Sequence, residues 1–115
     1  MIMPIPVTVT FRDMPPSPSV DALVRRWANR LTRLEPRIQR CDVTIDLPHR
    51  HHEHGRRFRA QIAIALPGRE IAVSHEPGDD DAHEDVRVAV RDSFRAARRQ
   101  LDAHVRRAAR SPRAA

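Results

Sequence analysis

Four short stretches of the chain alternate apolar with polar residues, which is the pattern of strands that bury one side. They lie near residues 5–11, 41–47, 58–66 and 71–75. Pro6 has no N–H to donate to a ladder, so we expect the first strand at a sheet edge or Pro6 among its first residues. Pro67 and Gly68 are typical of a tight turn, which predicts that the last two strands form a hairpin.

Two longer stretches repeat apolar residues every three or four positions, as amphipathic helices do. The first begins at a Ser17 or Ser19 cap, accommodates Pro18 in its first turn and ends at Pro36. The second runs from Asp85 to Arg110. The positions expected to be buried are Val20, Leu23, Val24, Trp27, Leu31 and Leu34 in the first helix, and Val86, Val90, Phe94, Ala97, Leu101, Val105 and Ala108 in the second.

The resulting element order is β-α-β-β-β-α, and the 115 residues suffice for one domain with one core. We therefore expect an α+β two-layer sandwich, with both helices packed on one face of a four-stranded, largely antiparallel sheet. The whole chain, residues 1–115, is taken as this single domain. Residues 48–56 and 76–84 are expected to form flexible loops, and residues 111–115 a frayed tail.

Arginine accounts for all 21 basic residues, which outnumber the 15 acidic residues and leave a net charge of +6. Such a balance favours polyanionic partners, and the planar guanidinium pairs bidentately with phosphate. The arginines follow the polar sides of the two helices. Candidate RNA-binding residues are Arg26, Arg30, Arg33 and Arg37 in the first row and Arg87, Arg91, Arg95, Arg98, Arg99, Arg106 and Arg107 in the second.

Like charges four residues apart destabilise a helix by roughly 0.2–0.5 kcal/mol per pair. An anionic partner lying along the second helix, close to 40 Å long at ~1.5 Å per residue, would offset that cost. The alternative interpretation is a basic face that contacts only solvent. The single sign of the charge and the presence of two rows favour the nucleic-acid interpretation.

Several short motifs resemble those of one known family. They are ALxxxxxxRLxRLE at residues 22–35, the opening DVRVAV at residues 85–90 and RQL at residues 99–101. In order and spacing the chain resembles the short form of the ribosome hibernation-promoting factors, also called protein Y or ribosomal subunit interface protein. The resemblance implies a fold like that of double-stranded-RNA-binding domains, no catalysis, and binding to 16S rRNA in the mRNA and tRNA channel of the small (30S) subunit. It further implies inhibition of translation in stress or stationary phase. Off the ribosome we expect a monomer.

Some positions match the basic residues of that family and others depart from them. Arg30 and Arg33 occupy basic positions of the first helix, and Arg99 occupies one of the last helix. Where the family often has lysine, this chain has Ala96, Ala103 and Val105; where the family has tyrosine and aspartate, it has Arg87 and Arg91. The basic character of the surface is expected to persist although individual contacts change.

A histidine-rich segment supplies the main alternative, a metal-binding protein. His49, His51, His52 and His54 can in principle ligate zinc, nickel or copper, but their spacing matches no standard zinc motif. Solvent-exposed histidines that bind nothing, or that gain positive charge near pH 6, are the other interpretations. The acidic run at 79–85 lacks EF-hand spacing and is expected to cap the last helix. No metal or cofactor is therefore predicted.

Other features of the sequence argue against disulfide-bonded, membrane-spanning, secreted and enzymatic proteins. The single cysteine, Cys41, cannot form an intramolecular disulfide and is expected to be inert on an apolar strand face. No apolar run approaches the ~18 residues of a membrane span, and no signal-peptide pattern opens the chain, so a cytoplasmic location is expected. No serine lies in a nucleophile motif, so we predict no enzyme and no small-molecule substrate. A regulatory module whose basic face meets an acidic protein, such as a sigma-factor modulator, remains a third possibility.

Overall fold

Six elements follow one another in the order expected from the sequence. The computed structural model describes residues 5–47, 58–75 and 85–110, with His75 and residues 108–110 described as backbone only. The elements are β1 (Val7–Arg12), α1 (Pro18–Leu34), β2 (Arg40–Asp46), β3 (Arg59–Leu66), β4 (Arg69–His75) and α2 (Val86–Arg110). The predicted α+β class and β-α-β-β-β-α order are confirmed.

The sheet has the strand order β1-β2-β3-β4. β1 pairs in parallel with β2, whereas the two later pairs are antiparallel. β1 is therefore an edge strand, and Pro6 lies just before it with its carbonyl accepting a hydrogen bond from the Cys41 N–H at 3.1 Å. Gly68 has φ of +71° in the two-residue turn between β3 and β4, a conformation that glycine adopts without steric cost.

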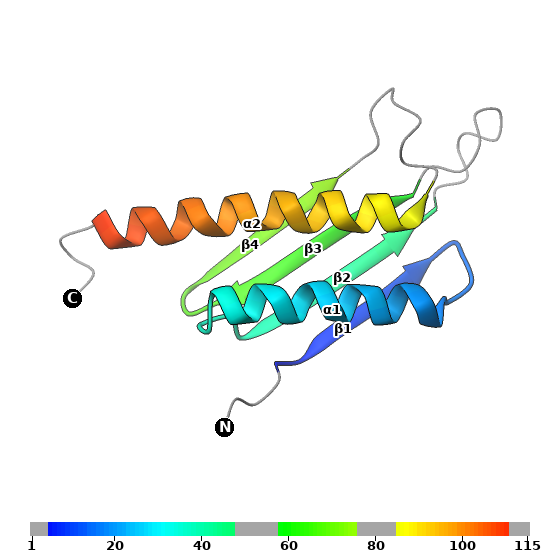
Figure 1. Ribbon diagram of the computed structural model, residues 1–115, viewed down its shortest axis with the longest axis horizontal. Coiled ribbons are helices and arrows are strands. Elements are labelled where there is room, and N and C mark those ends of the chain that lie inside the picture. Colours follow the sequence, from blue (N-terminus) through cyan, green and yellow to red (C-terminus); the bar gives the residue numbers. More distant parts are fainter. Residues whose placement is uncertain (1–4, 48–57, 76–84, 111–115) are drawn as a thin grey trace.

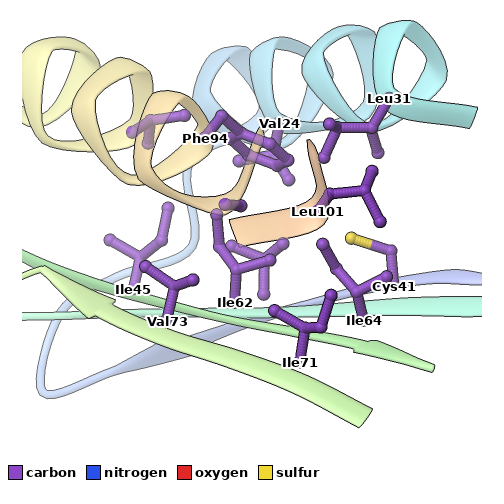
Figure 2. Packing of buried hydrophobic residues seen from close by; sticks show 14 of the residues in the cluster. Val24, Leu31, Cys41, Ile45, Ile62, Ile64, Ile71, Val73, Phe94 and Leu101 are labelled. Atoms are coloured by element: carbon purple, nitrogen blue, oxygen red, sulfur yellow. The ribbon is translucent and has the colours of Figure 1, made fainter. Parts of the chain in front are cut away.

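Both helices cover the same face of the sheet and run in the same direction, from their N-terminal ends at one side of the molecule (Figure 1). α1 lies on the β1 side and α2 lies over β3 and β4. Between the layers, Val24 and Leu31 of α1 and Phe94 and Leu101 of α2 meet the sheet (Figure 2). The strand residues labelled there are Cys41, Ile45, Ile62, Ile64, Ile71 and Val73.

The helices begin and end where the sequence predicts. The Ser17 side chain accepts a hydrogen bond from the Val20 N–H at 3.3 Å, which caps α1. After Leu34 the chain leaves the helix, and Pro36 cannot continue it. The Asp85 carboxylate accepts from the Arg87 N–H at 2.9 Å and so caps α2. The remainder of the acidic run lies outside the described residues.

Not every predicted core position is in the core: Val105 is half-buried and outside the core cluster, the side chain of Ala108 lies outside the described part, and Leu34 is wrong. Leu34 is 55% exposed, and Ala28 is buried in its place. The stripe that contacts the sheet is centred on Val20, Val24, Ala28 and Leu31; at 100° per residue, Leu34 lies about 75° from that centre. Its side chain therefore points along the side of α1 that faces α2 rather than into the core.

Two buried polar side chains and the buried cysteine have clear chemical environments. Ser93 donates to the Ala89 carbonyl at 2.8 Å and so satisfies its hydroxyl within α2. Asp46 pairs with the Arg59 guanidinium at 2.7 Å across β2 and β3. Burial, aided by Asp42, raises the pKa of the Cys41 thiol to about 12, which agrees with the expectation of an inert cysteine.

The exposed edge of β1 is contacted by a side chain from α1. Arg25 donates from Nη1 to the Val7 carbonyl oxygen at 3.0 Å. Asp21, one turn earlier, holds the same guanidinium through an Nε–Oδ1 contact of 3.0 Å. Asp21 thus orients Arg25 towards the strand. Among the described residues, neither helix is long and apolar enough to cross a membrane.

Candidate nucleic-acid interface

The arginines of the two helices gather on the side of the molecule that turns away from the sheet. Each helix uses its apolar stripe to pack on the same face of the sheet, so the polar sides of both point outward together. We call this the basic face. Its exposed members are Arg26, Arg30 and Arg33 of α1 and Arg87, Arg95, Arg98, Arg99, Arg106 and Arg107 of α2.

Three predicted binding arginines, Arg91, Arg98 and Arg37, form ion pairs with carboxylates. Arg91, which is half-buried, pairs with Asp92 at 3.2 Å, and Arg98 approaches Asp102 at 3.8 Å. The Arg98–Asp102 pair is exposed and the Arg91–Asp92 pair is partly exposed. Such pairs contribute about 0–1 kcal/mol, so an approaching phosphate can compete with them.

Arg37 differs from the other candidates because it follows α1 instead of lying on it. Its guanidinium contacts the buried Glu35 carboxylate at 2.7 Å, while 57% of the arginine side chain stays exposed. The hydrogen bonds from Arg37 lower the pKa of Glu35 despite the opposing effect of burial. Arg37 is thus held at the end of α1, with more than half of its side chain still exposed.

The remaining arginines of the basic face lack such partners. Within the part of the chain that the structure describes, no acidic side chain forms an ion pair with Arg26, Arg30, Arg33, Arg87, Arg95, Arg99, Arg106 or Arg107. Several of them stand four residues apart on one helix, where like charges repel. The fold therefore holds unneutralised positive charge at fixed positions, and this arrangement suits an anionic polymer.

The boundary between the two helices is aromatic. The rings of Trp27 in α1 and Phe94 in α2 stack with centroids 6.0 Å apart and an interplanar angle of 14°. The guanidinium carbon of Arg30 lies 5.2 Å from the centroid of the Trp27 ring, a cation–π contact. Arg30 thus joins the basic face to the boundary between α1 and α2.

The face of the sheet that turns away from the helices has a different character. Its side chains include Thr8, Thr10, Thr44, Gln61 and Ser74, together with three arginines and three acidic residues. Arg40 contacts Asp42 at 2.9 Å and Glu70 at 3.6 Å, and Arg59 pairs with Asp46. Because these charges balance locally, a polyanion has no electrostatic reason to choose this face.

The structure adds two basic groups that sequence reasoning missed. His104 of α2 is half-buried, and burial lowers its pKa. The positive charges of Arg69, Arg107 and Arg37 lower that pKa further. Arg69 begins β4, after the hairpin turn, and no helical periodicity in the sequence connects it with α2. It extends the positive region beyond the two predicted rows.

The metal alternative falls on residues that the structure does not describe. His49, His51, His52 and His54 lie outside the described ranges, as does the acidic run before Asp85. Across residues 5–47, 58–75 and 85–110, no group of three or more His, Cys, Asp or Glu side chains is placed to hold a metal ion. The described residues thus supply no support for a metal centre.

Known proteins share this fold. A ribosomal subunit interface protein from Coxiella burnetii superposes with a TM-score of 0.69 at 15% identity, over 87% of this chain and 97% of that chain. The N-terminal domain of Protein Y from Thermus thermophilus gives a TM-score of 0.64 at 20% identity, over 86% of this chain and 96% of that chain. At such identities the likeness shows the fold alone. No curated protein sequence matches the chain.

Family membership rests on the sequence itself. The family model described as Sigma 54 modulation protein / S30EA ribosomal protein matches residues 7–109. That range includes β1, α1, β2, β3 and β4 entire, all of α2 except its last residue, and every arginine of the basic face. The resemblance to ribosomal subunit interface proteins is confirmed: the chain belongs to the Sigma 54 modulation protein / S30EA ribosomal protein family.

Proposed function

We propose that this protein binds 16S rRNA of the small ribosomal subunit, in the channel that mRNA and tRNAs use, and thereby silences translation in stress or stationary phase. The observation that carries the proposal is the basic face, where arginines without acidic partners lie along two parallel helices. The family description names a ribosomal protein, and one structural neighbour is named a ribosomal subunit interface protein. Both agree with a ribosomal partner.

The dimensions of the basic face suit an RNA backbone. α2 has 25 residues and spans about 38 Å at 1.5 Å per residue, so its arginines can contact a succession of phosphates. Guanidinium groups pair with phosphate oxygens through two parallel N–H bonds and remain charged at every physiological pH. Binding would release counterions condensed on the RNA, which makes the affinity depend steeply on salt.

The proposed binding residues are the two rows identified from the sequence. Arg26, Arg30, Arg33 and Arg37 come from the α1 side, and Arg87, Arg91, Arg95, Arg98, Arg99, Arg106 and Arg107 from α2. Those without acidic partners among the described residues are expected to contribute most, because no intramolecular ion pair must break first. In this proposal inhibition is steric: the bound protein occupies the channel and performs no catalytic step.

Sucrose-gradient fractionation of stationary-phase cells tests the proposal. The protein should comigrate with 30S or 70S particles and leave them as salt is raised. A double variant, Arg95→Gln with Arg99→Gln, should shift towards the soluble fractions. The matched control, Arg12→Gln with Arg40→Gln, removes the same charge from the far side of the sheet and should stay with the particles. A wild-type protein found only in the soluble pool would contradict the proposal.

The family description also names modulation of sigma 54, which keeps a protein partner as a second candidate. An acidic protein surface would meet the same basic face, so the two candidates differ only in the partner. Competition decides between them. If ribosomal RNA at physiological salt fails to displace a bound acidic protein partner, the regulatory role is favoured over the ribosomal one.

A further inference from the structure

Trp27 stands between a buried ring and an exposed cation. Phe94 is 2% exposed and stacks on the indole with centroids 6.0 Å apart, whereas Arg30 is exposed and holds its guanidinium carbon 5.2 Å from the indole centroid. Trp27 thus contacts the core through Phe94 and the basic face through Arg30, and we call these three side chains the column. The indole itself is half-buried.

Core packing alone does not account for this column. Trp27 packs against the edge of the core and leaves part of its ring at the surface. Its indole N–H, a donor that is normally bonded when buried, donates to no acceptor among the described residues. Leu34, two turns further on the same side of α1, is 55% exposed. An apolar strip thus accompanies the arginines where α1 faces α2.

We propose that Trp27 and Arg30 form a binding point for one unpaired nucleotide, whose base stacks on the column and whose phosphate pairs with Arg30. A guanidinium can offer its plane to a base while its edge donates hydrogen bonds to phosphate. The free indole N–H supplies an additional donor for a base or ribose oxygen. This inference rests on the proposed RNA-binding function and adds a preference for unpaired RNA over duplex RNA.

The preference follows from the shape of the two kinds of RNA. In a duplex the base faces are stacked on their neighbours, so only phosphates and 2′-hydroxyls reach the basic face. An unpaired base can leave its neighbours and stack on an aromatic or guanidinium plane. Phosphate contacts alone hold both kinds of RNA, whereas the column would contribute affinity only for the unpaired strand.

Fluorescence gives a direct readout because Trp27 is the single tryptophan and the chain has no tyrosine. Full-length protein is titrated with an unpaired RNA of about 12 nucleotides and with an abasic oligomer of equal length and charge. The intact RNA should quench Trp27 and bind about tenfold more tightly than the abasic oligomer. Equal affinity and equal quenching would overturn the inference while leaving the proposed function intact. Failure of both oligomers and of ribosomes to bind would overturn the proposed function.

Substitutions distinguish the contribution of the column to RNA affinity from the contribution of positive charge alone. Arg30→Gln should reduce the preference for intact over abasic RNA. Arg26→Gln removes the same charge from a neighbouring exposed position and should lower the affinity for both oligomers equally. Trp27→Phe retains a stacking ring and should keep most of the preference; Trp27→Leu should lose it. Labelled oligomers report affinity for these variants, and thermal melts verify folding. If Arg30→Gln and Arg26→Gln behave alike, the column is merely part of the helix packing.

Discussion

The two outer surfaces of this molecule differ in how much of their arginine charge is paired with carboxylates. On the side of the sheet away from the helices, Arg40 and Arg59 each face a carboxylate within ion-pairing distance. On the helix side, Arg95, Arg99 and Arg106 have no such partner in the described part of the chain. Both surfaces are arginine-bearing, so composition alone does not separate them. The difference teaches that the excess charge is placed where two helices can present it to one extended anion.

The largest expected effect comes from removing the ring that joins α1 to α2. Phe94→Ala should lower the free energy of unfolding by roughly 3–5 kcal/mol, because it leaves a cavity beneath Trp27 and beside the sheet. RNA binding would fail with the fold, since the two arginine rows would lose their fixed spacing. Urea denaturation measures this. A loss below about 1 kcal/mol would show that the helices do not depend on this contact.

The second effect concerns the arginines of the helix side that are unpaired among the described residues. Arg95→Gln with Arg99→Gln should reduce the magnitude of the salt-dependence slope of ribosome or RNA affinity by about 1.5, as two phosphate contacts are lost. Stability should be unchanged or slightly higher, because like-charge repulsion within α2 falls and glutamine is a good helix former. A salt titration of the affinity gives the slope, and thermal melts in parallel give the change in stability. Arg12→Gln with Arg40→Gln is the control and should leave the slope as in wild type.

The third effect concerns the ion pair at the end of α1. Hydrogen bonds from Arg37 lower the pKa of Glu35, so the unfolded chain binds a proton there more readily than the folded protein does. The resulting stabilisation is present above the ordinary glutamate pKa and is lost as pH falls through the lowered value. Glu35→Gln should therefore cost about 1 kcal/mol at neutral pH and flatten the acid limb of the stability profile.

Melts from pH 7 to pH 3 would check the third prediction. The difference between wild type and Glu35→Gln should shrink as the solution becomes acidic. A constant difference across that range would mean that the variant perturbs packing instead of the ionised pair.

The smallest effect is expected at Leu34. Because the side chain is 55% exposed, Leu34→Ala should change the free energy of unfolding by no more than about 0.5 kcal/mol. The same denaturation series used for Phe94 measures it. A cost approaching that of a core leucine would show that Leu34 is covered in solution, by a second molecule or by residues outside the described ranges.

Local signals in the sequence predicted much of the fold. Ser17, Pro36 and Asp85 set the helix ends, because capping and the missing proline N–H act within a few residues. Alternation fixed which strand residues face the helices, since each strand residue turns opposite to its neighbour. Even the outward direction of both arginine rows followed from the position of the apolar stripes.

Features that depend on two distant elements were not predictable in this way. Nothing in the spacing of Trp27 and Phe94 indicates that their rings stack, because the offset of α1 against α2 sets that contact. The exposure of Leu34 reflects its angular distance from the stripe of α1 that packs on the sheet, which is known only once the buried positions are seen. The approach of Arg69 to His104 likewise requires the hairpin turn to lie beneath α2. The pairing of Arg59 with Asp46, which lie 13 residues apart, also emerges only once β2 and β3 are paired.

The Arg25 contact with the edge of β1 has a consequence for the protein in concentrated solution. An exposed strand edge offers unpaired backbone groups to which another chain can add as a further strand. The Val7 carbonyl already accepts a hydrogen bond from Arg25, and the charged side chain stands over that edge. A second β-strand would have to displace both, so this arginine discourages aggregation and keeps the sheet from growing beyond β1.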